Sequence, residues 1–343
     1  MNEMDTTRAN ICDIINFGIP HIAEQIFHVC ETRDLIACLS VSKTWKVIAE
    51  KVLLEKWKGK TSKACYAGHT KIVKLLLDHG YGLEKDVDIT ASLFLACKQG
   101  HQGIVNSFLE CFKATSCLGN QYLNGLNPND EDDFDVNPFM LACIYGKKNI
   151  VELFLNHPGG KCIEWNAKTW DCATAFYFAC ENGHSDVVKL LLDHSESKNI
   201  DLNTRFIGEN NAPNALDIAV LSKKINVIKV IFEHPVARKR IGWNFVNSKG
   251  ETAFHLACQS GEEAIVQMFI DHSQMLNIDL NARYMGHGNT GWMDACKYDK
   301  PNIVKLLIQY PELIDFSFYH NMRLSGPIRK VLTTYFCLVP NVP

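Results

Sequence analysis

One spacing recurs seven times along this 343-residue chain and constrains its fold more than any other feature. An alanine is followed eight residues later by a pair of β-branched residues, as Ala179 is followed by Val187-Val188. The other six alanines with such a pair are Ala64, Ala96, Ala142, Ala219, Ala257 and Ala295. Recurrence at a period of roughly 20–50 residues is typical of stacked structural repeats. The chain is therefore expected to form an array rather than a single layered domain.

The stretch from Thr174 to Ser195 shows the unit most clearly. Its apolar residues at helical spacing predict two short helices. Gly183-His184 lies between them, because glycine tolerates the left-handed conformation that often ends a helix. A helix pair this short cannot bury its apolar face alone, so neighbouring copies must cover it.

The segment Thr252-Ala253-Phe254-His255-Leu256-Ala257 resembles the T-P-L-H-x-A signature of the ankyrin repeat. The resemblance implies an all-α solenoid of about seven helix-turn-helix repeats over residues 59–310. Most intervals exceed the family period of about 33 residues. We expect the surplus to form projecting β-hairpin loops at residues 158–173, 196–213, 235–251 and 273–289. Residues 311–343 are then a degenerate C-terminal capping unit.

Composition excludes several classes of function. A hydrophobic content of 47% and a net charge of −3 do not suit a general nucleic-acid binder. The apolar runs are too short to cross a membrane, and the N-terminus has no signal-peptide core. Six of the fourteen cysteines share one repeat position, where small hydrophobic side chains are expected: Cys65, Cys97, Cys143, Cys180, Cys258 and Cys296. We therefore expect reduced thiols and a cytoplasmic or nuclear location.

Chemistry-bearing patterns are few. A histidine recurs fifteen residues after five of the repeat alanines, at His79, His157, His194, His234 and His272. Stacked helices lie roughly 8–10 Å apart and zinc ligand bonds are about 2 Å, so these histidines cannot share one ion. They are expected to bond free carbonyls at the ends of second helices. No C-x-x-C pair occurs, and no glycine-rich phosphate loop is expected. We expect no catalytic, cofactor or metal site, and the chain is not expected to be an enzyme.

Residues 11–58 lack the repeat and resemble an F-box. Ile26-Phe27, Asp34-Leu35 and Val41-Ser42-Lys43-Thr44-Trp45 fall at that family's spacings, although Ile19-Pro20 lies one residue closer to Ile26 and Ser42 replaces the common cysteine. The resemblance implies docking on a Skp-family adaptor within an SCF-type cullin–RING ubiquitin ligase. The adaptor-binding residues it implies are Pro20, Ile26, Phe27, Leu35, Val41 and Trp45.

An alternative function for the same segment is that of a helical cap over the open end of the array. The chain would then be an ankyrin-repeat scaffold with no link to a ubiquitin ligase. Residues 1–10 are expected to be a flexible N-terminus under both hypotheses. The chain is expected to be a monomer outside the complex.

The target is expected on the loop tips and on the exposed face of each first helix. Residues there vary although the neighbouring helical positions repeat, as an unpacked surface allows, and exposed aromatic residues among charges are typical of interface hot spots. The expected target-binding residues are Tyr145, Trp170, Asp171, Glu181, Asn182, Lys249, Gln259, Lys297 and Tyr298. The identity of the protein target does not follow from these positions.

Overall fold

The structure is a computed structural model that describes residues 20–80, 86–114, 122–124, 135–207, 212–283, 288–316 and 324–338. The chain divides into two compact units. Unit 1 contains Met1–Asp133 and Glu152–Ile163, and unit 2 contains Phe134–Val151 and Glu164–Pro343. The predicted flexible N-terminus lies outside the described residues. The boundaries predicted for the N-terminal, repeat and capping segments remain predictions.

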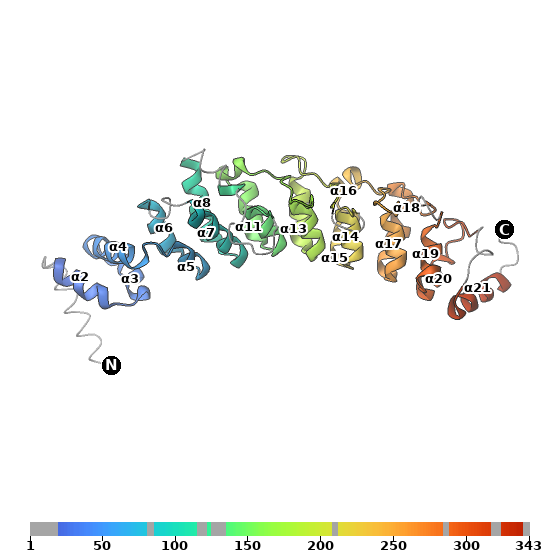
Figure 1. Ribbon diagram of the computed structural model, residues 1–343, viewed down its shortest axis with the longest axis horizontal. Helices are drawn as coiled ribbons and strands as arrows, with labels where there is room; N and C mark the ends of the chain where they lie inside the picture. Colours follow the sequence, from blue (N-terminus) through green and yellow to red (C-terminus); the bar gives the residue numbers. More distant parts are fainter. Residues whose placement is uncertain are drawn as a thin grey trace. The chain divides into compact units, whose positions relative to one another are not determined.

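Unit 1 begins with three helices that pack on one another, and two helix pairs follow (Figure 1). Helices α2 and α3 both pack on α4, and α4 packs on α6. Ser42 begins α4 by accepting a hydrogen bond from the Trp45 N–H at 3.3 Å, as an N-cap serine does. The helices are α2 (Pro20–Val29), α3 (Thr32–Cys38), α4 (Lys43–Trp57), α5 (Thr61–Tyr66), α6 (Thr70–Asp78), α7 (Asp86–Gln99) and α8 (Gln102–Ala114).

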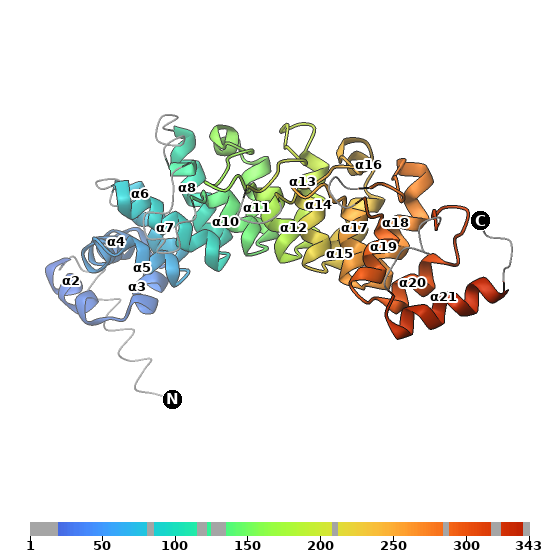
Figure 2. The ribbon, with the colours of Figure 1, turned by 45° about the vertical axis from the view of Figure 1, so that its right-hand side comes forward.

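Unit 2 is built from helix pairs that follow one another (Figures 1 and 2). The first helices α10, α12, α14, α17 and α19 pack successively, and α21 packs on α20. Helix α11 (Lys148–Asn156) crosses the boundary between the units. The other helices are α10 (Pro138–Ile144), α12 (Ala175–Asn182), α13 (Ser185–His194), α14 (Ala215–Leu221), α15 (Ile225–Glu233), α16 (Pro235–Arg240), α17 (Ala253–Ser260), α18 (Glu263–Leu276), α19 (Gly291–Lys297), α20 (Pro301–Leu307) and α21 (Gly326–Leu338).

The repeat positions have the burial that the sequence predicts. All seven alanines are fully buried, and so are the six cysteines that share one position. Gly183 ends α12 in the left-handed region at φ +84°, as predicted. At the preceding turn, a Cβ added to Gly146 would lie 2.5 Å from the His184 ring, which donates from Nε2 to the Ile144 carbonyl at 2.8 Å. The turn glycine therefore makes room for the next turn's histidine.

The predicted β-hairpin loops are not present in the described residues. These residues form no strand, and one isolated bridge joins Val246 to Thr252. Parts of three of these loops are helical instead: residues 158–162 form the 3-10 helix η1 (Pro158–Cys162), residues 235–240 form α16, and α18 extends to Leu276. Pro235 at the first position of α16 fixes a helical φ, and His234 caps that helix by accepting from the Val236 N–H.

An asparagine ladder joins successive loops of unit 2. Asn203 Oδ1 accepts from the Gly242 N–H at 2.9 Å, and its Nδ2 donates to the Arg240 carbonyl at 2.7 Å. Asn166, Asn244 and Asn281 make the same two bonds to the loop that follows each of them. Each amide thus satisfies one donor and one acceptor of an irregular backbone, which would otherwise lack partners. The ladder sets the position of one loop against the next.

Candidate functional site

Six of the nine predicted target-binding residues are exposed. Tyr145 and Tyr298 lie at the ends of α10 and α19, and Trp170 lies in the loop before α12 with 66% of its surface exposed. The Lys297 ammonium lies over the Tyr298 ring at 5.5 Å. The exposed residues are Tyr145, Trp170, Asn182, Lys249, Lys297 and Tyr298, and all belong to unit 2. They remain predicted contacts.

Asp171 is not on the surface, although the sequence suggested a loop tip. Its exposed fraction is 3%, and it accepts a hydrogen bond from the Thr169 hydroxyl. Thr169 Oγ1 also accepts from the Ala173 N–H at 2.9 Å, so these residues form a closed turn. The Asp171 side chain therefore organises the loop that presents Trp170.

Gln259 is half-buried and already engaged. Its Nε2 donates to Glu251 Oε1 and to Asp294 Oδ2, both at 2.9 Å, and joins two buried carboxylates of neighbouring repeats. Glu251 also accepts from Asn247 Nδ2 at 2.9 Å. Gln259 thus holds the fold together at this place and offers little to a partner.

Glu181 is half-buried at the end of α12 and has a different environment. Burial is the main cause that raises the pKa of its carboxyl, and the charge of Asp171 adds to it, whereas Lys224 opposes it. No described cation forms an ion pair with Glu181 within 4.0 Å. Lys224 therefore offsets the negative charge of Glu181 only in part, without a direct ion pair.

Two exposed aliphatic residues near the loop tips were missed by the sequence analysis. Ile207 is 68% exposed, and Val246 is also exposed. The Ile207 N–H donates to the Asp171 carbonyl at 2.7 Å, which places Ile207 beside the Trp170–Asp171 loop. A large aliphatic residue in a polar loop segment was the available signal, because such residues are seldom needed for a turn.

The residues implied as adaptor-binding divide between the core and the surface of unit 1. Phe27, Leu35 and Trp45 are buried, and the Phe27 and Trp45 rings meet edge to face at 5.7 Å. Val41 is 55% exposed and Ile26 is half-buried. The side chain of Pro20 lies outside what the structure describes. Of the five members whose side chains the structure describes, Val41 and Ile26 are available to a partner without unfolding.

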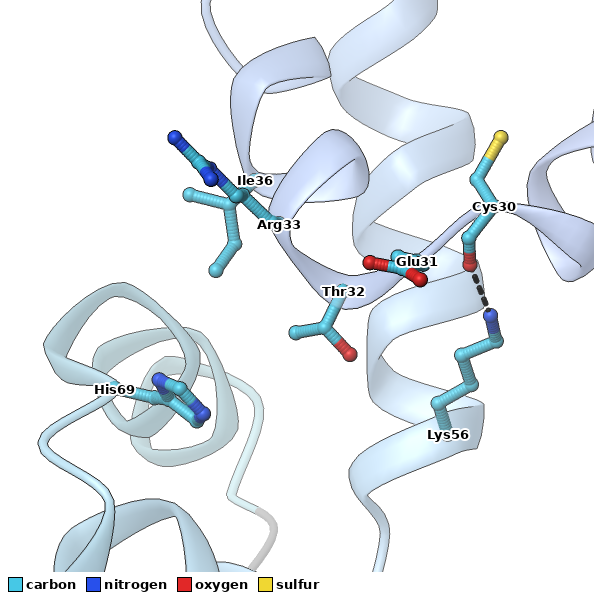
Figure 3. Close-up of a pocket in the computed structure, with 7 residues that line it drawn as sticks. All are labelled: Cys30, Glu31, Thr32, Arg33, Ile36, Lys56 and His69. Carbon is cyan, nitrogen blue, oxygen red and sulfur yellow. Dashed lines mark hydrogen bonds between the residues drawn. The ribbon is translucent and has the colours of Figure 1, made fainter.

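A pocket of about 660 Å³ lies beside α3, α4 and the start of α6 in unit 1 (Figure 3). In Figure 3, His69 and Lys56 lie on opposite sides of it. The Lys56 ammonium donates to the Cys30 carbonyl at 2.6 Å, so its charge is committed to the end of α2. The remaining lining residues are Glu31, Thr32, Arg33 and Ile36. They offer one acid and one free base, which do not converge into a charged site.

The recurring histidines form no common cluster, and only part of their predicted role holds. His194 and His272 donate from Nδ1 to the carbonyls of Leu190 and Met268, as expected at helix ends. His157 and His234 instead bond the carboxylates of Glu110 and Asp193 on neighbouring helices, at 2.8 and 3.0 Å. Within the described residues, the one group of three possible metal ligands is Glu24, His28 and Glu55, which lies outside this series.

The described cysteines form no disulfide. Burial raises the pKa of five of the six repeat-position thiols, and that of Cys296 reaches about 12. These thiols are therefore protonated at neutral pH and are poor nucleophiles.

The successive helix pairs define a class of repeat protein, and the comparisons identify the family. Three overlapping matches to the family model for ankyrin repeats cover residues 111–204, 163–241 and 216–317. They span more than half of the chain, so the chain belongs to the ankyrin-repeat family. Ankyrin repeats bind protein partners and are generally interaction scaffolds without enzymatic activity.

Two solved structures are similar. The human ASB11 ankyrin repeat domain is 18% identical with a TM-score of 0.48, over 69% of this chain and 91% of that one. A chain from the complex of the predatory endopeptidase Bd0816 of Bdellovibrio bacteriovorus with the immunity protein Bd3460 is 21% identical with a TM-score of 0.43, over 60% and 91%. No curated protein matches the sequence. None of the helices that the structure describes is long and apolar enough to cross a bilayer.

Proposed function

We propose that this chain is a substrate-recognition subunit of an SCF-type cullin–RING ubiquitin ligase. Residues 11–58 dock on a Skp-family adaptor, and the ankyrin repeats hold the protein target. The chain itself supplies binding and positioning, and the ligase supplies the chemistry.

The motif at residues 34–45 supports the adaptor part of this proposal most directly. Asp34 and Leu35 lie in α3, Val41 lies in the turn after it, and Trp45 lies in the first turn of α4. Burial of Leu35 and Trp45 explains why such a motif needs these residues, since they hold α3 and α4 together. Val41 is then held at a fixed place on the surface between the two helices.

The surface of this three-helix segment suits a partner. Val29, Val41 and Val47 are large hydrophobic residues that are exposed to solvent. Burying one such side chain against a partner gains roughly 1.5–3 kcal/mol. Several of them on 38 residues of helix and turn are typical of a protein-binding surface.

One contact favours the alternative, in which the same helices only cap the array. The Trp57 ring at the end of α4 meets the His69 ring edge to face at 5.3 Å, and α4 packs on α6. The helices α2–α4 therefore cover the first helix pair of unit 1. This covering role is compatible with adaptor binding, because Val41 stays exposed.

The test uses the whole chain and a purified Skp-family adaptor. We expect direct binding, and we expect Val41→Glu to weaken it at least tenfold because a charge would enter an apolar interface. Ile225→Glu, at an exposed aliphatic residue of α15, is the matched control and should change nothing. If the unmodified chain does not bind the adaptor, the scaffold hypothesis replaces this one.

A further inference from the structure

Three carboxyl groups on two neighbouring repeats lie within electrostatic range of the Tyr177 hydroxyl. Burial raises the pKa of Tyr177 most, and the charges of Glu181, Asp171 and Asp217 each raise it further. Glu181 and Tyr177 belong to α12, Asp171 to the loop before it, and Asp217 to α14. The first-helix side of α12 and α14 is thus a concentrated negative region.

Two cations lie within electrostatic range of this region, because Lys224 lowers the pKa of Glu181 and Arg205 lowers the pKa of Asp217. The aliphatic stem of Lys224 lies along the turn at Gly183, where an added Cβ would come within 2.9 Å of Lys224 Cδ. The Arg205 guanidinium lies over the Phe245 ring at 4.6 Å. Among the described residues, neither forms an ion pair with the three carboxylates. The negative charge of the cluster is therefore only partly offset within the fold.

Asp217 adds an independent observation. Its side chain is buried, and its Oδ2 accepts from the Asn214 N–H at 3.0 Å. Its Oδ1 is buried without any hydrogen-bond partner. Retaining such a group costs stability, because a buried acceptor without a partner loses its hydration. When it is ionised, its charge acts through a medium of low dielectric, which strengthens its attraction for a cation.

Apolar surface borders the same region. Trp170 and Ile207 are both mostly exposed, and the bond from the Ile207 N–H to the Asp171 carbonyl joins their loops. An aromatic ring beside carboxylates can cover the aliphatic stem of a long cationic side chain while its charged end reaches the acids. Glu181, the half-exposed member of the cluster, is the acid that such an end would contact first.

We propose that this surface binds an extended segment of a protein partner that carries a lysine or arginine next to an apolar residue. The cationic end pairs with Glu181 in the field of Asp171 and Asp217, and the apolar neighbour packs on Trp170 and Ile207. This inference rests on the proposed function in one respect: it specifies the chemistry of the target that the repeats hold. Charge complementarity identifies the partner as basic.

The test is selection of peptides from a random 12-residue display library on the immobilised whole chain. The enriched peptides should contain Lys or Arg beside an aromatic or aliphatic residue and should be poor in Asp and Glu. A synthetic enriched peptide should then bind Glu181→Gln and Trp170→Ala at least tenfold more weakly than the unmodified chain. Its affinity should also fall as salt rises, because the pairing is electrostatic.

The control variant is Glu263→Gln, an exposed acid on α18, which should bind the peptide unchanged. Glu181→Gln removes a carboxylate whose charge is unfavourable in the folded state, so this variant should remain folded. A thermal melt of the variant checks that its loss of binding does not come from misfolding. Enrichment of acidic or uncharged peptides, no enrichment, or unchanged binding by Glu181→Gln would each overturn the inference. Adaptor binding, measured separately, should be the same in all variants, so failure here and failure of the ligase proposal are distinct results.

Discussion

Asn203 donates a hydrogen bond to Arg240 across a repeat boundary, and Arg240 donates one back to the segment that precedes Asn203. Asn203 Nδ2 donates to the Arg240 carbonyl at 2.7 Å, and the Arg240 guanidinium donates to the Ile200 carbonyl at 2.9 Å, three residues before Asn203. Arg238 likewise donates to the Phe232 carbonyl. Two of the three basic residues at 238–240 are therefore used to fix α16 in place.

Removing the asparagine should weaken this boundary. Asn203→Ala leaves the Gly242 N–H and the Arg240 carbonyl without their partner, and we expect the free energy of unfolding to fall by about 1–3 kcal/mol. Urea denaturation measures this change. The control is Asn226→Ala on the exposed side of α15, which should stay within about 0.5 kcal/mol. Equal effects of the two substitutions would show that the ladder has no special role.

A substitution in the core of one repeat should destabilise mainly that repeat and its neighbours. Leu191 is fully buried in α13, so Leu191→Ala should cost roughly 2–5 kcal/mol. The adjacent Leu190 is only half-buried, and Leu190→Ala should cost less. Because each repeat contacts its neighbours alone, hydrogen exchange should accelerate in α12–α15 before it does so in α19–α21. A uniform loss of protection over unit 2 would contradict this.

The buried Asp217 should make stability depend on pH. Burial raises its pKa from 3.8 to about 7, Asn214 and Arg205 lower it, and Glu251 raises it. A carboxyl with a raised pKa in the folded state stabilises the fold at low pH, and this contribution is lost as pH rises from about 4 through 7. Asp217→Asn should therefore stabilise the chain at pH 8 by up to about 4 kcal/mol, and by much less at pH 4.

Thermal melts of both proteins across pH 4–8 measure this difference. A constant difference across that range would show that Asp217 does not titrate there. The same variant should also weaken binding of the basic peptide, since the charge that it removes lies in the proposed site. Stability gained at the expense of binding is common where a functional site contains an unfavourable charge.

Native thiols should react in two classes. The six repeat cysteines are buried, and burial raises the thiol pKa of five of them, whereas Cys162 and Cys172 are partly exposed. Brief alkylation with iodoacetamide at pH 8, followed by peptide mass spectrometry, should label the second group and leave the first unlabelled until denaturant is added. A reductant and a chelator should leave the melting temperature unchanged. A fall of several degrees with either would reveal a bridge or a metal that stabilises the fold.

The repeat framework was predictable because its determinants are local and periodic. The alanines, the cysteines beside them and Gly183 occupy positions at which only small or flexible residues fit, and the structure places them there. The asparagine ladder could also have been predicted from the sequence. Its members end the recurring pattern Ile-x-(Trp/Leu)-Asn at residues 163–166, 200–203, 241–244 and 278–281.

The binding surface was less predictable because exposure depends on tertiary bonds. Asp171 and Gln259 are polar and lie in loop or helix-end positions, but a hydroxyl bond buries the first and two carboxylates engage the second. The prediction of hairpin loops was wrong for a different reason. His234-Pro235, at the start of α16, is a helix-initiation signal, and the sequence analysis gave more weight to the expected hairpin. Leu35 and Trp45 are a third case. These motif residues are buried, so they support the surface from below and are not part of it.

The asparagine ladder has a consequence for how such a chain changes length. Each repeat in the series contributes one amide to the next loop and receives one from the loop before it, so every copy contains both halves of its own joint. Duplication of a whole copy within a gene would therefore create two boundaries that are already complementary. Insertion or loss of a unit needs no compensating substitution at these joints, and the binding face can lengthen or shorten by one repeat at a time.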